Sequence, residues 1–145
     1  MRSCVVDASV AAKWLLPSAG EDLVREANHL LSLHVRRHLH LIAPDVIRAE
    51  IGNVLWKAIR RNRTTRSSAE NSVRQFLDLG LEIVSTEQLL PSALSIAVAY
   101  DRTFYDSLYV SLALSATAEL ITADERLANA LASRFPIRWL GAFHE

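Results

Sequence analysis

Two aspartates of this chain follow short apolar runs that are typical of buried strands. Asp7 comes directly after Cys4–Val6, and Asp124 comes two residues after Glu119–Thr122. In a parallel sheet the carboxyl ends of the strands meet at one edge, where ligand sites gather. We therefore expect both carboxylates at the same edge of a sheet.

Two further acids lie in helical patterns at positions that should not be freely solvated. Glu50 lies on or beside the apolar stripe of its helix, where its neighbours one turn away include Ile47 and Val54. Asp106 lies in the first turn of a helix that is apolar nearly all the way round. A carboxylate in such surroundings is costly unless something compensates its charge.

A shared divalent cation would compensate all four acids. Four carboxylates brought together repel one another, and some of them would have to protonate. A cation removes this cost, and hard oxygen ligands without cysteine or an obligatory histidine favour Mg²⁺ or Mn²⁺ over Zn²⁺. The sequence therefore predicts a metal site formed by Asp7, Glu50, Asp106 and Asp124.

Each acid also has a purely structural interpretation. Asp7 and Asp124 could each cap the helix that follows them. Glu50 and Asp106 could each form an ion pair with an arginine inside the fold. The arginines considered for this role are Arg48, Arg102 and Arg126.

The elements that must position these acids alternate along the chain. Short apolar runs predict strands at 4–7, 39–44, 81–85, 119–122 and 137–140. Amphipathic patterns predict helices at 21–33, 46–61, 67–79, 89–100, 105–116 and 124–132, and a short helix that begins near residue 8. Strands that alternate with helices predict an α/β fold with a mainly parallel sheet of four to five short strands.

Local signals predict how some of these helices begin and end. Asp45 should cap the helix that begins at residue 46, and Thr86 lies in a plausible cap region before residue 89. Gly80 suits the position just after a helix end. Asp101 precedes the helix of Asp106 and is expected to be a turn residue.

The length and composition indicate a folded protein without a membrane-spanning segment. The 145 residues suit one domain over 1–145, and the zero net charge argues neither for nor against a nucleic-acid partner. Cys4 is the only cysteine, which excludes an intrachain disulfide and a metal site built on thiolates. No apolar run is long enough to span a membrane, and the N-terminus lacks the pattern of a signal peptide, so a cytoplasmic protein is expected.

Four segments of the chain, each containing one of the acids, resemble the four motifs of the PIN-domain ribonucleases. They are VVDASVAAKWLLP around Asp7, APDVIRAEIGNVLWKAIRR around Glu50, RTFYDSLYVSLA around Asp106 and LITADERLANAL around Asp124. Their order, spacing and flanking residues agree over nearly the whole chain. Within that family, the chain is similar to the VapC-type toxins of bacterial and archaeal toxin–antitoxin pairs.

The resemblance implies a fold, an activity and partners. The fold is a compact α/β/α sandwich, and the activity is that of a Mg²⁺- or Mn²⁺-dependent endoribonuclease that hydrolyses RNA phosphodiesters with a metal-activated water. A small VapB-like antitoxin and, commonly, a homodimer are implied as well. The resemblance also places Ser9 and Thr122 where the family often has a hydroxyl near the acids, although a helix-start hydroxyl and a strand-end turn residue remain open as interpretations.

Two other functions remain to be distinguished from a ribonuclease toxin. A PIN-like module could bind RNA or a protein without cleavage, and the loss of acids would be its signature, whereas this chain has all four. A phosphotransferase would need a nucleophilic aspartate loop and a lysine near phosphate. Lys13 and Lys57 are the only lysines, and no such arrangement is evident.

Two basic stretches could contact RNA phosphates. RRNRTTR joins two predicted helices and supplies Arg60, Arg61, Arg63 and Arg66. HVRRHLH, over residues 34–40, lies at a helix end, and either stretch could instead be a solvated helix terminus. Trp14 and Trp56 lie within helical apolar patterns, so core or interface packing is expected for them rather than base stacking.

Overall fold

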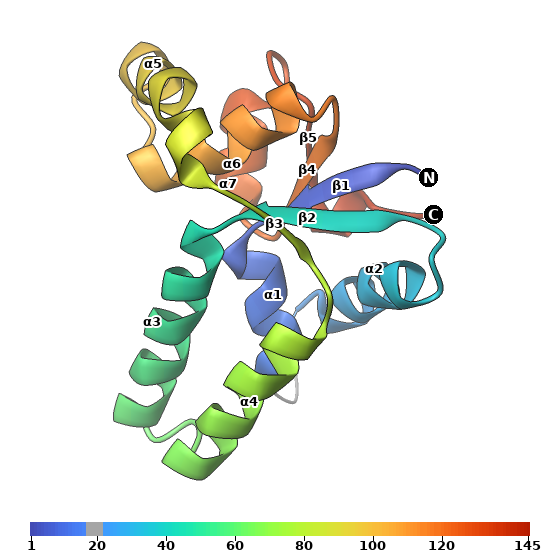
Figure 1. The fold of residues 1–145 in the computed structure, drawn as a ribbon, viewed down its shortest axis with the longest axis vertical. Coiled ribbons are helices and arrows are strands. Elements are labelled where there is room, and N and C mark those ends of the chain that lie inside the picture. The colour runs from blue at the N-terminus through green and yellow to red at the C-terminus, as the bar shows by residue number, and fades with distance from the viewer. Residues whose placement is uncertain (17–21) are drawn as a thin grey trace.

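A five-stranded parallel sheet forms the centre of the structure, which is a computed structural model that describes residues 1–16 and 22–145. The strands lie in the order β3-β2-β1-β4-β5, and every pairing between them is parallel (Figure 1). Their bounds are β1 Ser3–Val6, β2 His40–Pro44, β3 Glu82–Val84, β4 Glu119–Thr122 and β5 Ile137–Trp139. The α/β fold with a mainly parallel sheet of short strands is confirmed.

Helices cover both faces of this sheet and complete an α/β/α sandwich. Helices α1 to α4 lie on one side, where α3 and α4 form a long hairpin, and α5 to α7 lie on the other (Figure 1). Their bounds are α1 Ala8–Leu15, α2 Val24–Val35, α3 Val46–Arg60, α4 Arg66–Asp78, α5 Leu90–Tyr100, α6 Phe104–Ser115 and α7 Glu125–Leu131. Short 3₁₀ turns occupy Thr86–Leu89 and Leu140–Ala142.

The central strand β1 shows why the sheet is buried on both faces. Val5 belongs to a core that includes Leu108 and Val110 of α6, whereas Cys4 and Val6 belong to a second core that includes Leu30 of α2. Successive side chains of a strand point to opposite faces, so an uninterrupted apolar run fills both cores.

The strand order reverses at β1, and this reversal positions the candidate site. From β1 the chain builds β2 and β3 on one side, and then returns to place β4 and β5 on the other. Val6 of β1 is paired with Ile121 of β4, so these two strands end at neighbouring points. Asp7 follows β1 and Asp124 follows β4, as predicted, and a ligand crevice is expected where such a strand order reverses.

Most element boundaries differ from the predicted ones by one to three residues. The helix expected over 21–33 runs over Val24–Val35, and residue 21 lies outside the described residues. The helix expected from residue 89 begins at Leu90, because the Ser85 hydroxyl accepts the N–H of Glu87 and starts a 3₁₀ turn ahead of it. Gly80 has a φ of 72° and Asp101 a φ of 53°, which confirms a helix-end position and a turn residue.

The predicted capping role of Asp45 is wrong. Asp45 precedes α3 with helical backbone angles, φ −61° and ψ −21°, and its side chain makes no capping hydrogen bond. A capping side chain needs an extended backbone to turn back onto the first amides of the helix. Thr65 has that conformation, with φ −101° and ψ 161°, and its hydroxyl accepts the N–H of Ser68 at the start of α4.

The two tryptophans singled out in the sequence have different surroundings. The indole N–H of Trp14 donates to the carbonyl of Ala27, and its ring packs against the core. Trp56 on α3 is 52% exposed, so core packing, one of the two expectations for it, is wrong. Across the described ranges, no helix combines the length and the apolar character that crossing a bilayer requires.

Candidate active site

The four predicted acids come from four elements that meet at the carboxyl edge of the sheet. Asp7 precedes α1, Glu50 lies in the second turn of α3, Asp106 lies in the first turn of α6, and Asp124 precedes α7. Electrostatic interactions join Asp106 to Asp7, to Glu50 and to Asp124. The structure therefore places Asp106 among the other three carboxylates.

Asp7 is the most deeply buried of these acids, with 7% of its surface exposed. Its Oδ1 accepts the N–H groups of Ser9 at 3.1 Å and Val10 at 3.3 Å, so it caps α1. Burial raises the pKa of Asp7 to about 6, although the hydroxyls of Ser9 and Thr122 oppose the rise because they favour the ionised form. The carboxylate is thus held in one orientation at a cost in free energy.

Ser9 and Thr122 join the two strand ends through their hydroxyls. The Ser9 hydroxyl lies 2.5 Å from Oδ1 of Asp7 and accepts the N–H of Ala123 at 2.9 Å. The Thr122 hydroxyl accepts the N–H of Asp124 at 3.0 Å and lies 3.4 Å from the Ser9 hydroxyl. These contacts tie the loop that carries Asp7 to the loop that carries Asp124.

Glu50 is held by a residue that sequence reasoning missed. The hydroxyl of Tyr109, on α6, donates to Oε1 of Glu50 across 2.5 Å. Burial raises the pKa of Glu50 and the tyrosine hydroxyl lowers it, while the nearby Asp106 charge raises it further. Tyr109 is three residues after Asp106 and therefore shares its helix face, which is the signal that could have identified it.

Asp106 lies at a capped helix start and is half-buried. Its backbone N–H donates to the Thr103 hydroxyl at 3.1 Å. Burial raises the pKa of Asp106, the Thr103 hydroxyl and the Arg102 charge lower it, and the Asp124 charge raises it. Arg102 also escaped the sequence reasoning as a site residue, and its Nε is buried without a hydrogen-bond partner among the described residues.

Asp124 is the exposed member of the group. Its Oδ1 accepts the N–H groups of Arg126 at 3.1 Å and Leu127 at 3.2 Å, so it caps α7. The structural interpretations of Asp7 and Asp124 as caps are therefore correct. A cap uses a carboxylate oxygen for backbone amides and does not prevent the same group from facing a site, so both interpretations hold for these residues.

The alternative of structural ion pairs is not borne out for Glu50 and Asp106. Neither acid forms an ion pair with a basic group of the described chain. Arg102 acts on Asp106 only through its charge at longer range. Two half-buried carboxylates without a cationic partner leave room for an added positive charge.

The arrangement does not bring the four acids together as a finished metal shell. In the part of the chain that the structure describes, no three His, Cys, Asp or Glu side chains are grouped closely enough to hold one ion. Like charges repel, and this separation is what their repulsion favours when no cation lies between them. Holding an ion would require the side chains, above all Glu50 and Asp106, to turn towards one another.

The basic stretches predicted to contact RNA differ in their engagement. Arg60, Arg61 and Arg63 end α3 and begin the loop to α4, whereas Arg66 starts α4 and pairs with Glu70 at 2.8 Å. In the other stretch His34 is structural, since its Nδ1 accepts the N–H of Leu41 and its Nε2 lies 3.1 Å from the carbonyl of Leu79.

A comparison with family models decides the fold family. The model described as "PIN domain" matches residues 4–131, which include all four acids. The chain belongs to the PIN domain family. The resemblance inferred from the four motifs is therefore confirmed.

Curated relatives of this PIN domain carry ribonuclease names. The chain is 31% identical over 127 residues to Ribonuclease VapC3 of Pyrobaculum aerophilum, with 86% of this chain and 92% of the relative aligned. It is 30% identical over 133 residues to Ribonuclease VapC1 of Mycobacterium tuberculosis, with 90% and 92% aligned.

Solved structures confirm the PIN fold at lower sequence identity. PAE2754 from Pyrobaculum aerophilum is similar with a TM-score of 0.69 at 24% identity, covering 97% of this chain and 92% of that one. VapC20 of Mycobacterium tuberculosis, described as a "Sarcin-Ricin loop cleaving toxin", has a TM-score of 0.63 at 17% identity, covering 91% and 95%. The PIN match ends before β5, which nevertheless pairs in register with β4.

Proposed function

We propose that this PIN domain is a divalent-metal-dependent endoribonuclease that acts as the toxin of a toxin–antitoxin pair. The observation that carries the proposal is the position of Asp106, which interacts electrostatically with Asp7, Glu50 and Asp124 at the carboxyl edge of the sheet. The ribonuclease names of the VapC relatives, at 30–31% identity over most of the chain, supply the activity.

The donor set suits Mg²⁺ or Mn²⁺. Asp7, Glu50, Asp106 and Asp124 offer only carboxylate oxygens, the ligands that hard divalent cations prefer. Burial raises the pKa of the first three, so a bound cation would offset a cost that the fold already bears. An ion held there supplies the means to ionise a water near neutral pH and to stabilise charge on a phosphodiester in hydrolysis.

The chain's own residues orient the acids for this role. Ser9 and the backbone amides of α1 fix the Asp7 carboxylate, and Tyr109 fixes Glu50 towards the face of α6 that carries Asp106. Thr122 fixes the backbone of Asp124. We propose Ser9 and Thr122 as supporting residues, because outer hydrogen bonds that hold metal-binding carboxylates strongly affect metal affinity and activity.

The proposed partners are RNA, an antitoxin and a second copy of the chain. Crystal structures with similar folds include a VapBC2 complex from Rickettsia felis and a toxin–antitoxin complex from Klebsiella pneumoniae, and a VapB-like antitoxin is proposed here on that basis. We further propose that residues 1–145 form a single domain and that the protein works in the cytoplasm, as a toxin acting on cellular RNA would.

For the homodimer we propose the exposed face of α5. Leu90, Leu94 and Val98 are exposed at intervals of four residues and thus form one stripe along this helix. α5 contains no charged residue, so pairing this stripe with its copy would bury no charge. An isologous contact of this kind is the commonest way in which identical chains associate.

The test is cleavage of total RNA by the purified chain in Mg²⁺, in Mn²⁺ and in EDTA, with Asp106→Asn and Asp101→Asn as a matched pair. Wild type and Asp101→Asn should cleave with either metal and not in EDTA, while Asp106→Asn should be inactive. Absence of cleavage by metal-loaded wild type would favour the alternative, a PIN-like module that binds RNA or protein without cutting.

A further inference from the structure

The outer face of α3 carries cations and an aromatic ring in line with a site acid. Because a helix turns about 100° per residue, Asn53, Lys57 and Arg60 follow Glu50 along one side of α3. Lys57 comes seven residues after Glu50, which is almost two full turns, and Arg60 comes about 15 Å further along the axis than Glu50. We call Asn53, Trp56, Lys57 and Arg60 the α3 ridge.

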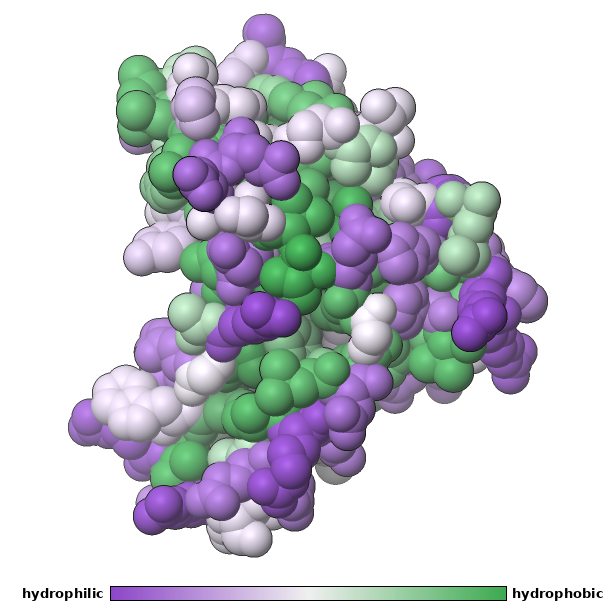
Figure 2. Space-filling model, viewed as in Figure 1, coloured by the Kyte–Doolittle hydropathy of each residue, from purple (hydrophilic) through white to green (hydrophobic). Residues whose placement is uncertain are grey.

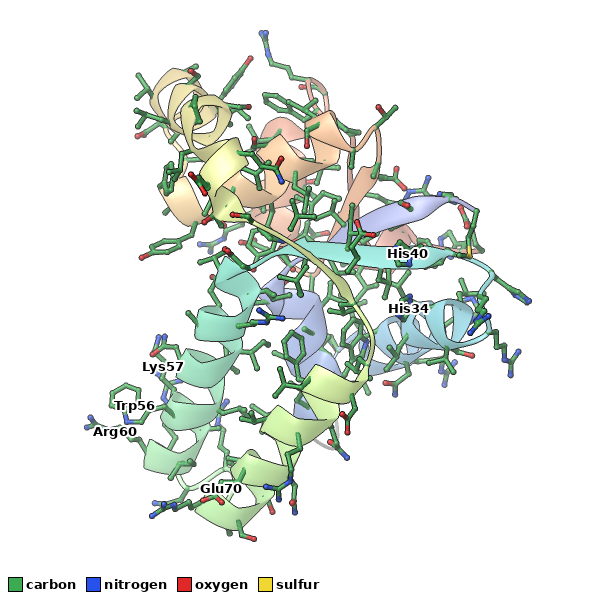
Figure 3. The ribbon with its side chains drawn as sticks, in the orientation of Figure 1. His34, His40, Trp56, Lys57, Arg60 and Glu70 are labelled. Carbon is green, nitrogen blue, oxygen red and sulfur yellow. The ribbon has the colours of Figure 1, made fainter. Side chains whose placement is uncertain are left out.

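All four residues of the α3 ridge are exposed, whereas the buried side chains of α3 point elsewhere. Ile47, Ile51 and Leu55 bury the opposite stripe against the core, and Trp56, one residue beyond Leu55, is 52% exposed. Figure 3 shows Trp56, Lys57 and Arg60 projecting from α3 away from α4. The ridge is thus a free surface of the hairpin and not part of its packing.

The cations of the α3 ridge have no acidic partner. The Arg60 guanidinium lies over the Trp56 ring, 4.9 Å from its centroid, and no carboxylate of the described chain pairs with Arg60 or Lys57. Glu50 is the only acid in α3, against Arg48, Lys57 and Arg60. A positive surface that its own protein leaves uncompensated is suited to an anionic ligand.

The α3 ridge is also continuous with the proposed active site. Glu50 begins the line on α3, and its carboxylate meets Tyr109 of α6. On this side the space-filling view shows a recess in the molecular outline between the upper helices and the α3–α4 hairpin (Figure 2). A strand with its scissile phosphate near Glu50 would therefore extend over Lys57 and Arg60.

We propose that the α3 ridge holds single-stranded RNA beside the active site, with Lys57 and Arg60 on phosphates and Trp56 stacked on a base. This inference rests on the proposed ribonuclease function and assigns positioning residues to it. A flat ring with a guanidinium beside it offers stacking and charge together, which is how single strands are bound without reading their sequence. A duplex would not present its bases to Trp56, so the single strand is the ligand that uses the whole ridge.

The first experiment measures binding in EDTA, where cleavage does not interfere. The probe is a fluorescent oligouridine of about 12 nucleotides, followed by anisotropy over a series of salt concentrations. Lys57→Gln/Arg60→Gln should lower the salt dependence, removing about 0.7 from the log–log slope for each phosphate contact. Trp56→Ala should weaken binding about fivefold to a hundredfold with the slope unchanged.

The control removes the same charge elsewhere. Arg25→Gln/Arg36→Gln deletes two exposed arginines of α2 and the turn after it, on another part of the molecule, and should bind like wild type. Equal losses in the ridge variant and this control would overturn the proposal, since only net charge would then matter. Unchanged RNA binding with a change in self-association or antitoxin binding would also overturn it and assign the ridge to a protein.

A second measurement separates this proposal from the proposed function. With Mg²⁺ and an RNA that wild type cleaves, ridge variants should raise KM with little change in kcat, because they lose binding that is uniform along the reaction. If wild type cleaves no RNA but its oligouridine binding depends on the ridge, the ridge stands and the ribonuclease proposal fails. If wild type cleaves and the ridge variants match it in KM, the ridge proposal alone fails.

Discussion

The hydroxyl of Tyr109 donates to Oε1 of Glu50 across 2.5 Å, and this bond joins α6 to α3 on the side of the sheet edge where Asp106 lies. The two residues are 59 positions apart and come from helices on opposite faces of the sheet. Tyr109 is buried and shares a helix face with Asp106, so it sets the position of one acid relative to another.

Replacing Tyr109 by Phe should lower ribonuclease activity while the fold is retained. Loss of the hydroxyl removes a hydrogen bond to a carboxylate, which contributes about 1.5–3 kcal/mol, and lets the pKa of Glu50 rise further. Outer hydrogen bonds of this kind change metal affinity or activity by about 10- to 100-fold. The check is kcat and metal affinity of Tyr109→Phe. Tyr105→Phe, an exposed tyrosine of the same helix, is the control, and equal effects in both would contradict the assigned role.

Replacing Asp7 by Asn should stabilise the metal-free protein at neutral pH. The folded-state pKa of about 6 lies above the ordinary value of 3.8, so above pH 6 the buried charge destabilises the fold. As the pH falls through 6 the folded protein binds a proton that the unfolded chain does not yet bind, and the wild type gains stability down to about pH 4. Asn removes the charge and keeps an oxygen for the amides of Ser9 and Val10.

The measurement is thermal unfolding of wild type and Asp7→Asn in EDTA between pH 4 and 8. The variant should be more stable by about 1–3 kcal/mol at pH 7.5, and this difference should shrink towards pH 4. Asp101→Asn, at an exposed turn, should match wild type throughout. A difference that stays constant with pH would show that charge burial is not its cause.

Placing acids on α5 should separate a homodimer into monomers. Leu94→Glu/Val98→Glu would put two like charges opposite their copies in an isologous contact and weaken association about tenfold or more. Light scattering coupled to size-exclusion chromatography measures the change in mass. Leu77→Glu, an exposed leucine on α4, is the matched control. A dimer that survives the α5 changes and dissociates with Leu77→Glu would move the interface to another helix.

The sequence could predict the location of the candidate site because its signals are local. Asp7 and Asp124 follow apolar runs that the sheet buries, and strand ends are fixed by which residues avoid water. Glu50 and Asp106 were recognisable from helical phase alone. Their gathering at one edge then followed from parallel pairing, which alternation of strands and helices predicts.

What the sequence could not supply depends on backbone angles and on packing between distant segments. Asp45 looks like a cap, but its helical φ and ψ prevent this. The bond between Tyr109 and Glu50 requires knowing how α6 approaches α3, which no local pattern specifies. Trp56 lies in an apolar stretch of sequence, yet one residue past Leu55 rotates it about 100° out of the buried stripe.

The central claim is that the four acids hold a divalent cation, and calorimetric titration of Mn²⁺ into the purified chain tests it most directly. Wild type and Asp101→Asn should bind Mn²⁺ with the same affinity, and Asp106→Asn should bind it at least about tenfold more weakly while remaining folded. Absence of Mn²⁺ binding by wild type, or equal affinity in Asp106→Asn, would contradict the account.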